Sequence, residues 1–185
     1  MKIYPFNFTQ PQEIDCDWPV FSYKNILDEQ VFAQLQTEFN DVKWDQMKVR
    51  DADDLESSWY KIDSDHILHE YFGSQELREY LHSKTGVDLS DCWLHINFKY
   101  DSPAHLLQGP HQDESICVLT FQIFLNEESY PDGGTILHSA DRDFELPLAR
   151  NTGGFFKNDK KSLHSVQQRG YHRKSILVRY KQNNA

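Results

Sequence analysis

The stretch "GPHQDESICVLTFQIFLN", residues 109–126, decides the fold of this 185-residue chain. Its second half is an apolar strand, and just before that strand His111 and Asp113 stand with one residue between them. Alternate residues of an extended chain share a face, so one cation could bind both side chains. An isolated pair of this kind is by default a solvated turn. The rest of the chain must therefore supply a third ligand before the pair indicates a metal site.

Short β-like runs dominate the chain after residue 86, and turn signals such as "YPDGG" and "NTGG" separate them. Many short strands of this kind are typical of a sandwich or barrel. The runs are "CWLHINFKY", "SICVLTFQIFLN", "GTILHS", "DFELPL", "GGFFKN" and "SILVRYKQ".

Two helices are expected before these strands. Residues 27–40 have Asp28 as N-cap, and residues 74–86 have Ser74 as N-cap and Gly86 as the terminating residue. Helices first and strands second predict one α+β domain over 1–185, with the helices packed on one face of a jelly roll. The expected division is a mostly helical and irregular part over 1–90 and a β core over 91–181.

Composition narrows the class of protein. Twelve Phe, nine Tyr and four Trp argue against disorder. The formal net charge of −10 and the absence of a basic cluster argue against a nucleic-acid partner. No apolar run could cross a bilayer, and "MKIYPFNFTQPQ" lacks the apolar core of a signal peptide, so no membrane association is expected. We expect a soluble, cytoplasmic protein whose three cysteines, Cys16, Cys92 and Cys117, are reduced and do not bind zinc.

His164, in "SLHSVQQ", is the best candidate for the third ligand, since several strands can turn back between it and His111. Two His and one carboxylate on a β scaffold form a facial triad, a donor set that suits Fe(II), Mn(II) or Zn(II). Nine residues later Arg173 opens the strand "RKSILVRY", with Ser175 and Arg179 on the same face. A guanidinium with a hydroxyl two residues on makes a good carboxylate site.

In this order, "HQD … GGT … GGFF … HSV … RKS" resembles the 2-oxoglutarate/Fe(II)-dependent oxygenases, most of all the prolyl-4-hydroxylase-like branch. The resemblance covers residues 93–181. It implies a double-stranded β-helix, as in cupins, with Fe(II) held by His111, Asp113 and His164. It also implies that Arg173 binds the distal carboxylate of 2-oxoglutarate, with Ser175 beside it.

Two aromatic positions bear on the co-substrate. Tyr100, in "FKYDSP", stands where many members of the family carry a Tyr that helps to bind 2-oxoglutarate. Phe124 stands where many members have another Tyr, and its ring has no hydroxyl to offer. Gln122 or Thr120, on the same strand face, is the candidate to compensate.

The remaining histidines each have a simpler interpretation. "HILHEYF", residues 66–72, matches neither zincin motif and is interpreted as a charged helix or loop face. His95, His105 and His138 either reach the pocket or are packed or solvated.

The implied function is hydroxylation of a C–H bond, with Fe(II), 2-oxoglutarate and dioxygen as partners and ascorbate as a candidate addition. The substrate would be a prolyl residue in a peptide or protein, a free amino acid or another small metabolite. The alternatives are a non-catalytic cupin-like binding module and a cupin-type isomerase or hydrolase, which would have no need of Arg173. No motif selects among the substrates or sets an oligomeric state.

Residues 42–65 are rich in charge and carry Trp44, Trp59 and Tyr60 without a helical or strand period. A long irregular segment with aromatics predicts a substrate lid, with Trp59 or Tyr60 beside the pocket. The alternative is that both aromatics pack into the seam between helices and sheet.

Overall fold

The computed structural model describes residues 2–9, 11–14, 16–44, 57–103, 108–166 and 170–183. The helices in this part are α1 (Glu29–Asp41), α2 (Ile67–Gly73) and α3 (Gln75–Thr85). The strands in it are β1 (Lys2–Ile3), β2 (Phe6–Asn7), β3 (Pro11–Glu13), β4 (Val20–Lys24), β5 (Ser57–Lys61), β6 (Trp93–Asp101), β7 (Gln108–His111), β8 (Cys117–Phe124), β9 (Thr135–His138), β10 (Asp143–Leu146), β11 (Thr152–Lys157), β12 (Leu163–Val166) and β13 (Arg173–Lys181).

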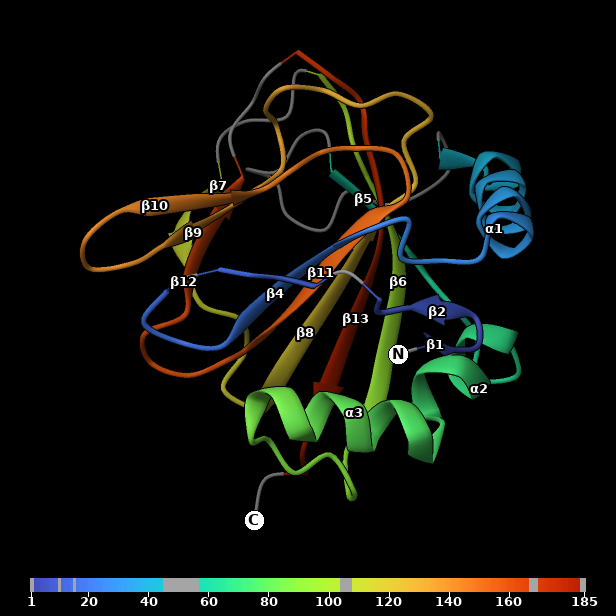
Figure 1. Ribbon diagram of the computed structural model, residues 1–185. Helices are drawn as coiled ribbons and strands as arrows, with labels where there is room; N and C mark the ends of the chain where they lie inside the picture. Colours follow the sequence, from blue (N-terminus) through green and yellow to red (C-terminus); the bar gives the residue numbers. More distant parts are fainter. Residues whose placement is uncertain are drawn as a thin grey trace.

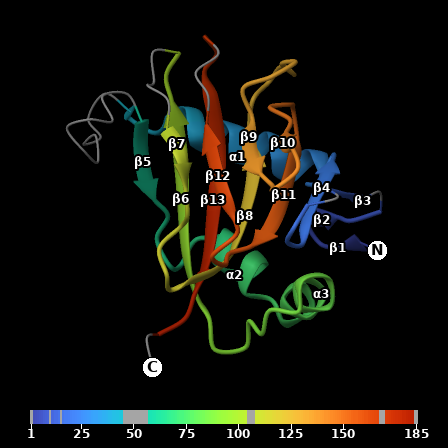
Figure 2. The same cartoon turned by 90° about the vertical axis from the view of Figure 1, so that its left-hand side faces the viewer.

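Two antiparallel sheets form the centre of the molecule (Figures 1 and 2). The larger has seven strands in the order β3-β4-β11-β8-β13-β6-β5, and the smaller has four in the order β10-β9-β12-β7. Strand order departs from chain order in both sheets, so the chain crosses repeatedly between them, as in a jelly roll. The expectation of a double-stranded β-helix in an α+β chain is confirmed.

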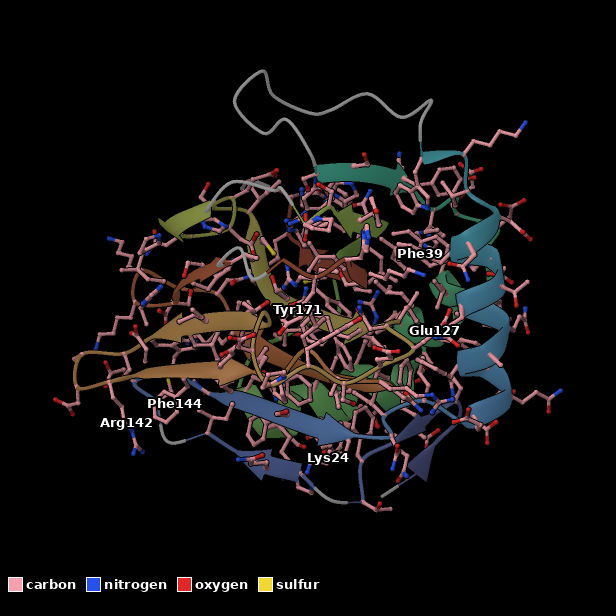
Figure 3. All side chains as sticks on the ribbon, turned by 90° about the horizontal axis from the view of Figure 1, so that it is seen from above. Lys24, Phe39, Glu127, Arg142, Phe144 and Tyr171 are labelled. Atoms are coloured by element: carbon pink, nitrogen blue, oxygen red, sulfur yellow. The ribbon has the colours of Figure 1, made fainter. Side chains whose placement is uncertain are left out.

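The two faces of the larger sheet bury different side chains. On β13, Ile176, Val178 and Tyr180 point to the face covered by the helices and join a core with residues of α1, α2 and α3. Phe39 is on the side of α1 that faces the sheets (Figure 3). The opposite face carries Arg173 and Arg179 toward the smaller sheet, where a second apolar cluster fills part of the space between the sheets. Strict alternation on one strand thus separates an apolar face from a polar one.

The expected helices form where their caps predicted them. Asp28 accepts a hydrogen bond from the backbone N–H of Gln30, and Ser74 accepts one from the N–H of Leu77. Gly86 ends α3 in the left-handed conformation at φ 71°, which costs glycine little. The "HILHEYF" stretch forms α2.

The part before residue 90 contains more β structure than expected. Strands β3, β4 and β5 all join the larger sheet, so this part is not only helical and irregular. Strand β5 falls inside the segment 42–65 that we expected to be irregular, while residues 45–56 of that segment lie outside the described residues. Such short strands gain their stability from neighbours distant in sequence, which a local pattern does not reveal.

Within the described ranges, every helix is too short or too polar to cross a membrane. Cys92 and Cys117 are buried free thiols and Cys16 is a partly buried one, as expected.

Candidate metal centre

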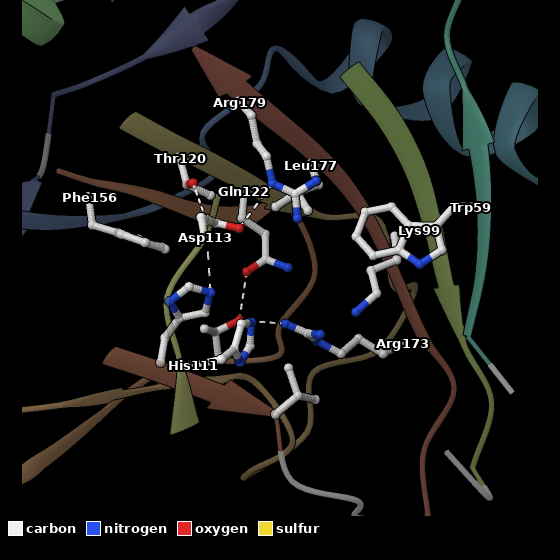
Figure 4. A pocket seen from close by; sticks show the side chains of 13 residues that line it. Trp59, Lys99, His111, Asp113, Thr120, Gln122, Phe156, Arg173, Leu177 and Arg179 are labelled. Atoms are coloured by element: carbon white, nitrogen blue, oxygen red, sulfur yellow. Dashed lines mark hydrogen bonds and ion pairs between the residues drawn. The ribbon is translucent and has the colours of Figure 1, made fainter. Parts of the chain in front are cut away.

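A cavity of about 50 Å³ lies between the two sheets, on the polar face of the larger one (Figure 4). All of its lining side chains except that of Asp113 come from strands, which fixes their positions. They are Trp59, Lys99, His111, Asp113, Thr120, Gln122, Thr135, Phe156, His164, Val166, Arg173, Leu177 and Arg179.

His111 and His164 are direct partners in the β7–β12 ladder, and their ring centroids are 4.4 Å apart. The Nδ1 of His111 lies 3.0 Å from the carbonyl oxygen of Gly109, and the Nδ1 of His164 lies 3.2 Å from that of Ser162. A carbonyl oxygen only accepts, so each Nδ1 carries the proton and each Nε2 offers its lone pair. This is the tautomer that metal-binding histidines adopt when a backbone carbonyl orients them.

Asp113 lies in the connection after β7, because that strand ends at His111. The Thr120 hydroxyl donates to its Oδ2 at 2.6 Å, and the Arg179 Nε–H donates to its Oδ1 at 3.1 Å. Burial alone would raise the pKa of Asp113, but Arg179, His164 and these hydrogen bonds outweigh it and hold the pKa below its usual value. The carboxylate is therefore ionised and oriented.

His164 is the third predicted ligand, and it lines the same cavity. Burial lowers the pKa of its imidazole to about 4, and the nearby Asp113 offsets only part of that effect, so the ring is neutral at neutral pH. Its Nε2 lies 4.0 Å from Asp113 Oδ2, too far for a hydrogen bond. Two imidazoles and one carboxylate suit Fe(II) chemically. In the described part of the chain, no three His, Cys, Asp or Glu side chains are grouped closely enough to hold a metal ion as they stand.

Arg173 stands elsewhere in the same cavity. Its Nη1 donates to Asp101 Oδ2 at 3.0 Å, its Nη2 donates to the Thr135 hydroxyl, and that hydroxyl donates to Gln122 Oε1 at 2.6 Å. Neither Arg173 Nε nor the hydroxyl of Ser175 has a hydrogen-bond partner among the residues that the structure describes. Buried donors without partners suit a carboxylate, but of these two residues Arg173 lines the cavity and Ser175 does not.

Tyr100 is not brought into this cavity. Its hydroxyl bonds His172 Nδ1 at 2.6 Å, and its ring packs against Trp44 with centroids 5.6 Å apart, on the helix-covered side of β6. The expected contact with the co-substrate cannot come from that face, because neighbouring residues of a strand point to opposite sides. Lys99 and Asp101 face the interior instead.

The other candidate residues are distributed as follows. The Arg173 guanidinium lies 5.2 Å from the centroid of the Phe124 ring. Phe124 therefore packs against Arg173, although it has no hydroxyl. His138 bonds Asp143 and Ser165, and His95 lines a separate outer groove. His105 lies outside the described residues.

The sequence analysis assigned no role to Lys99 or Asp101. Their signal was present, since Leu94, Ile96, Phe98 and Tyr100 form one apolar face of "CWLHINFKY" and leave the residues between them to the other face. Arg179 was placed on the face of Arg173, but its pairing with Asp113 was not foreseen.

Trp59 lies beside the cavity, as the first interpretation of the two aromatics predicted, and Tyr60 packs in the core, as the second predicted. Trp59 lines the cavity, where the Lys99 ammonium lies 5.0 Å and the Arg179 guanidinium 5.2 Å from its ring centroid. Tyr60 points the other way and packs on Phe98 in the helix-covered core.

The fold is a double-stranded β-helix, and the side chains between its sheets include the two histidines and the carboxylate predicted as metal ligands. No family model and no curated protein sequence matches the chain. Solved structures do match it, and they include prolyl hydroxylases and other 2-oxoglutarate enzymes.

The structure is similar to a Pseudomonas putida prolyl-4-hydroxylase, with a TM-score of 0.72 and 15% identity over 89% of this chain and 93% of that one. It is similar to a Trichoplax adhaerens prolyl hydroxylase in complex with a hypoxia inducible factor peptide fragment, with a TM-score of 0.69 and 12% identity over 88% and 83%. The α-ketoglutarate-dependent epimerase SnoN of nogalamycin biosynthesis matches with a TM-score of 0.65 and 15% identity over 88% and 77%. At these identities the likeness is one of fold, and it agrees with the resemblance in the sequence motifs.

Proposed function

We propose that this protein is an Fe(II)- and 2-oxoglutarate-dependent oxygenase that hydroxylates a C–H bond. One observation carries the proposal: a single cavity gathers His111, Asp113 and His164 together with Arg173. Two histidines and a carboxylate can hold Fe(II) and leave positions open, and a buried arginine can bind a carboxylate.

Each group has a defined task in this proposal. His111 and His164 would bind the metal through Nε2, and Asp113 would bind it through a carboxylate oxygen that Thr120 and Arg179 orient. Arg173 would bind the distal carboxylate of 2-oxoglutarate, with Ser175 as a further donor. When bound, iron and 2-oxoglutarate supply the oxidation of the substrate C–H bond. The surrounding sheets position the reactants and exclude water.

The proposed substrate is a prolyl residue in a peptide or protein, or a free amino acid. The likeness to two prolyl hydroxylases, one of them bound to a peptide, supports the first of these. Other small metabolites form the alternative, which the likeness to an epimerase of antibiotic biosynthesis supports. Ascorbate would act as an auxiliary reductant in the assay.

The competing candidate is a non-catalytic module with the same fold. The small cavity and the pairing of Arg173 with Asp101 favour it, because a five-carbon diacid needs more than about 50 Å³ and a free guanidinium edge. Arg173 Nε and Ser175 Oγ have no hydrogen-bond partner among the described residues. They favour the oxygenase, because a core with a purely structural role would pair its buried donors with acceptors.

The test is stepwise. Calorimetry with Mn(II) in place of Fe(II) measures binding of the metal and then of 2-oxoglutarate without turnover. Aerobic assays with Fe(II), ascorbate and candidate peptides or amino acids then measure succinate release and the mass of one added oxygen. His164→Ala should abolish both metal-dependent 2-oxoglutarate binding and succinate release. His138→Ala is the matched control on the same sheet, with its ring held by Asp143 and Ser165, and it should retain both.

The outcomes separate the candidates. Wild-type protein that binds Mn(II) and 2-oxoglutarate but never releases succinate would be a binding module. Wild-type protein that shows no metal-dependent 2-oxoglutarate binding, or His164→Ala with wild-type turnover, would reject the oxygenase.

A further inference from the structure

Lys99 is a buried lysine in the wall of the cavity, and the proposed chemistry does not use it. Only 4% of the residue is exposed. Its side chain extends from β6 toward Arg173, beside the ring of Trp59 (Figure 4). Burying an ammonium is expensive unless a partner compensates it, so Lys99 requires an explanation.

Asp101 is the partner of Lys99, but it is shared. Its Oδ1 lies 3.2 Å from the Lys99 ammonium, its Oδ2 accepts from Arg173 at 3.0 Å, and the Ser57 hydroxyl donates to Oδ1 at 2.7 Å. One carboxylate therefore stands between two buried cations. These three groups by themselves carry one excess positive charge, part of which the Glu145 carboxylate offsets at Arg173. The other ion pair of the cavity, Arg179 with Asp113, is balanced.

We infer that Lys99 is a second cation for the distal carboxylate of 2-oxoglutarate, which it shares with Arg173, while Asp101 is the fixed counter-ion that holds both cations in place. The inference rests on the proposed function and adds to it a residue that selects the co-substrate.

Strand register supports a shared site. Ser175 is the direct partner of Lys99 in the β13–β6 ladder, and Arg173 is the direct partner of Asp101. The two orphan donors, Arg173 Nε and Ser175 Oγ, therefore lie in the same two rows of the ladder as Lys99 and Asp101. A carboxylate added to the cavity would be attracted by both Lys99 and Arg173, and it would give Arg173 Nε an acceptor.

Trp59 restrains the ammonium on its other side. Strand β5 pairs Trp59 with Lys99, and the ammonium lies 5.0 Å from the ring centroid. A cation held between an aromatic face and a carboxylate has little freedom to swing into solvent. Lys99 is thus positioned before any ligand arrives.

The test compares two ligands that differ only at the distal end. 2-Oxoglutarate carries the distal carboxylate, and 2-oxopentanoate has a methyl group in its place. Calorimetry in the presence of Mn(II) measures the Kd of each for wild type and for Lys99→Met. We expect 2-oxoglutarate to bind the variant on the order of 30-fold more weakly or worse, because a buried cation is lost. Binding of 2-oxopentanoate and of Mn(II) should not change.

Lys174→Met is the matched control. Lys174 is adjacent to Arg173 in sequence, but its ammonium bonds the Asn40 side chain at the surface. This variant should bind both ligands as wild type does. Equal 2-oxoglutarate affinity in Lys99→Met and wild type would overturn the inference while leaving the proposed function intact. Wild-type protein that binds no 2-oxoglutarate at all would instead overturn the proposed function.

A double variant tests Lys99 after its counter-ion has been neutralised. The double variant combines Lys99→Met with Asp101→Asn, so the three groups keep one excess positive charge. No buried carboxylate loses its lysine partner in this variant, so it can replace the single variant if Lys99→Met fails to fold. Measured against Asp101→Asn alone, the double variant should still bind 2-oxoglutarate more weakly. If Lys99→Met has no effect on that background, Lys99 does not contact the ligand and the inference is wrong.

Discussion

At the scale of single residues, the orientation of Asp113 depends on a short chain of hydrogen bonds. The Asn158 amide donates to the Thr120 hydroxyl at 2.8 Å and to the Cys117 sulfur at 3.0 Å, and Thr120 in turn donates to Asp113. Burial raises the pKa of the Cys117 thiol to about 11, so it stays protonated and adds no charge beside the carboxylate. Thr120 therefore positions Asp113, which is one of the proposed metal ligands.

Thr120→Val removes this hydroxyl and keeps the shape of the side chain. We expect Mn(II) affinity to fall roughly 10- to 100-fold, the usual loss when a group that orients a metal ligand is removed. Calorimetry measures the affinity, and thermal unfolding checks the fold.

Thr152→Val is the control for Thr120, since Thr152 is also buried but its hydroxyl donates to the backbone carbonyls of Pro147 and Ala149, far from Asp113 in the chain. It should change stability without changing Mn(II) affinity. Unchanged Mn(II) binding in Thr120→Val would show that Asp113 keeps its orientation without the Thr120 hydroxyl.

Some of the cavity residues could be predicted from the sequence and others could not, because only some of them belong to a pattern that is visible along the chain. His111, His164 and Arg173 belong to a motif whose order is visible along the chain, and the structure brings them into one cavity. Tyr100 was assigned by motif position, while the apolar alternation of its own strand placed it on the helix side. The pairing of Arg179 with Asp113 depends on the path of the connection after β7, for which the sequence has no local signal.

At the scale of elements, β11 is a strand with little room for side chains. It lies between β4 and β8, and a Cβ added at Gly153 would meet the Gln122 carbonyl oxygen at 2.6 Å. The glycine pair in "NTGGFFKN", expected in a turn, lies inside β11, where close backbone approach requires it.

Gly153→Ala should lower the free energy of unfolding by about 1–3 kcal/mol, because β8 or β11 must shift to accept the methyl group. Urea denaturation measures the change. Gly73→Ala is the comparison: its nearest contact, at 3.7 Å to Leu94, is an ordinary one, and it should leave stability close to that of wild type. A Gly153→Ala protein as stable as wild type would mean that the sheet relaxes at no cost.

Helices were easier to predict than short strands for a physical reason. A cap such as Ser74 or Gly86 acts within a few residues, so its signal is local. Strands β7 (QGPH) and β12 (LHSV) have four residues each, and one contains both Gly and Pro. Only their pairing with each other and with β9 makes them strands.

At the scale of the whole molecule, Asn151 joins the segment before α1 to the start of β11. Its side-chain amide donates to the Leu27 carbonyl at 2.9 Å and accepts from the Leu27 N–H at 3.0 Å, although the two residues are distant in sequence. Its φ of 50° lies in the left-handed region, which asparagine tolerates better than most residues.

Asn151→Ala should destabilise the protein by about 2–4 kcal/mol, since two buried hydrogen bonds are lost and alanine is strained at positive φ. Chemical denaturation gives the value. Asn7→Ala provides the reference, because Asn7 bonds only Thr9 of its own surface turn through its side chain. If both variants lose the same small amount, Asn151 does not join the two parts in the way its contacts indicate.

The indole of Trp59 also has a spectroscopic consequence. It lies against two cations of the cavity wall, whereas Trp18 is buried in the apolar cluster between the sheets, Trp44 packs on Phe39 and Trp93 is exposed. Indole emission responds to the electric field across the ring, so a charge arriving between Lys99 and Arg173 changes the colour and yield of this one fluorophore. Subtracting the spectrum of Trp59→Phe isolates that signal. The wall proposed to hold the ligand would thus also be an intrinsic optical reporter of whether the cavity is filled.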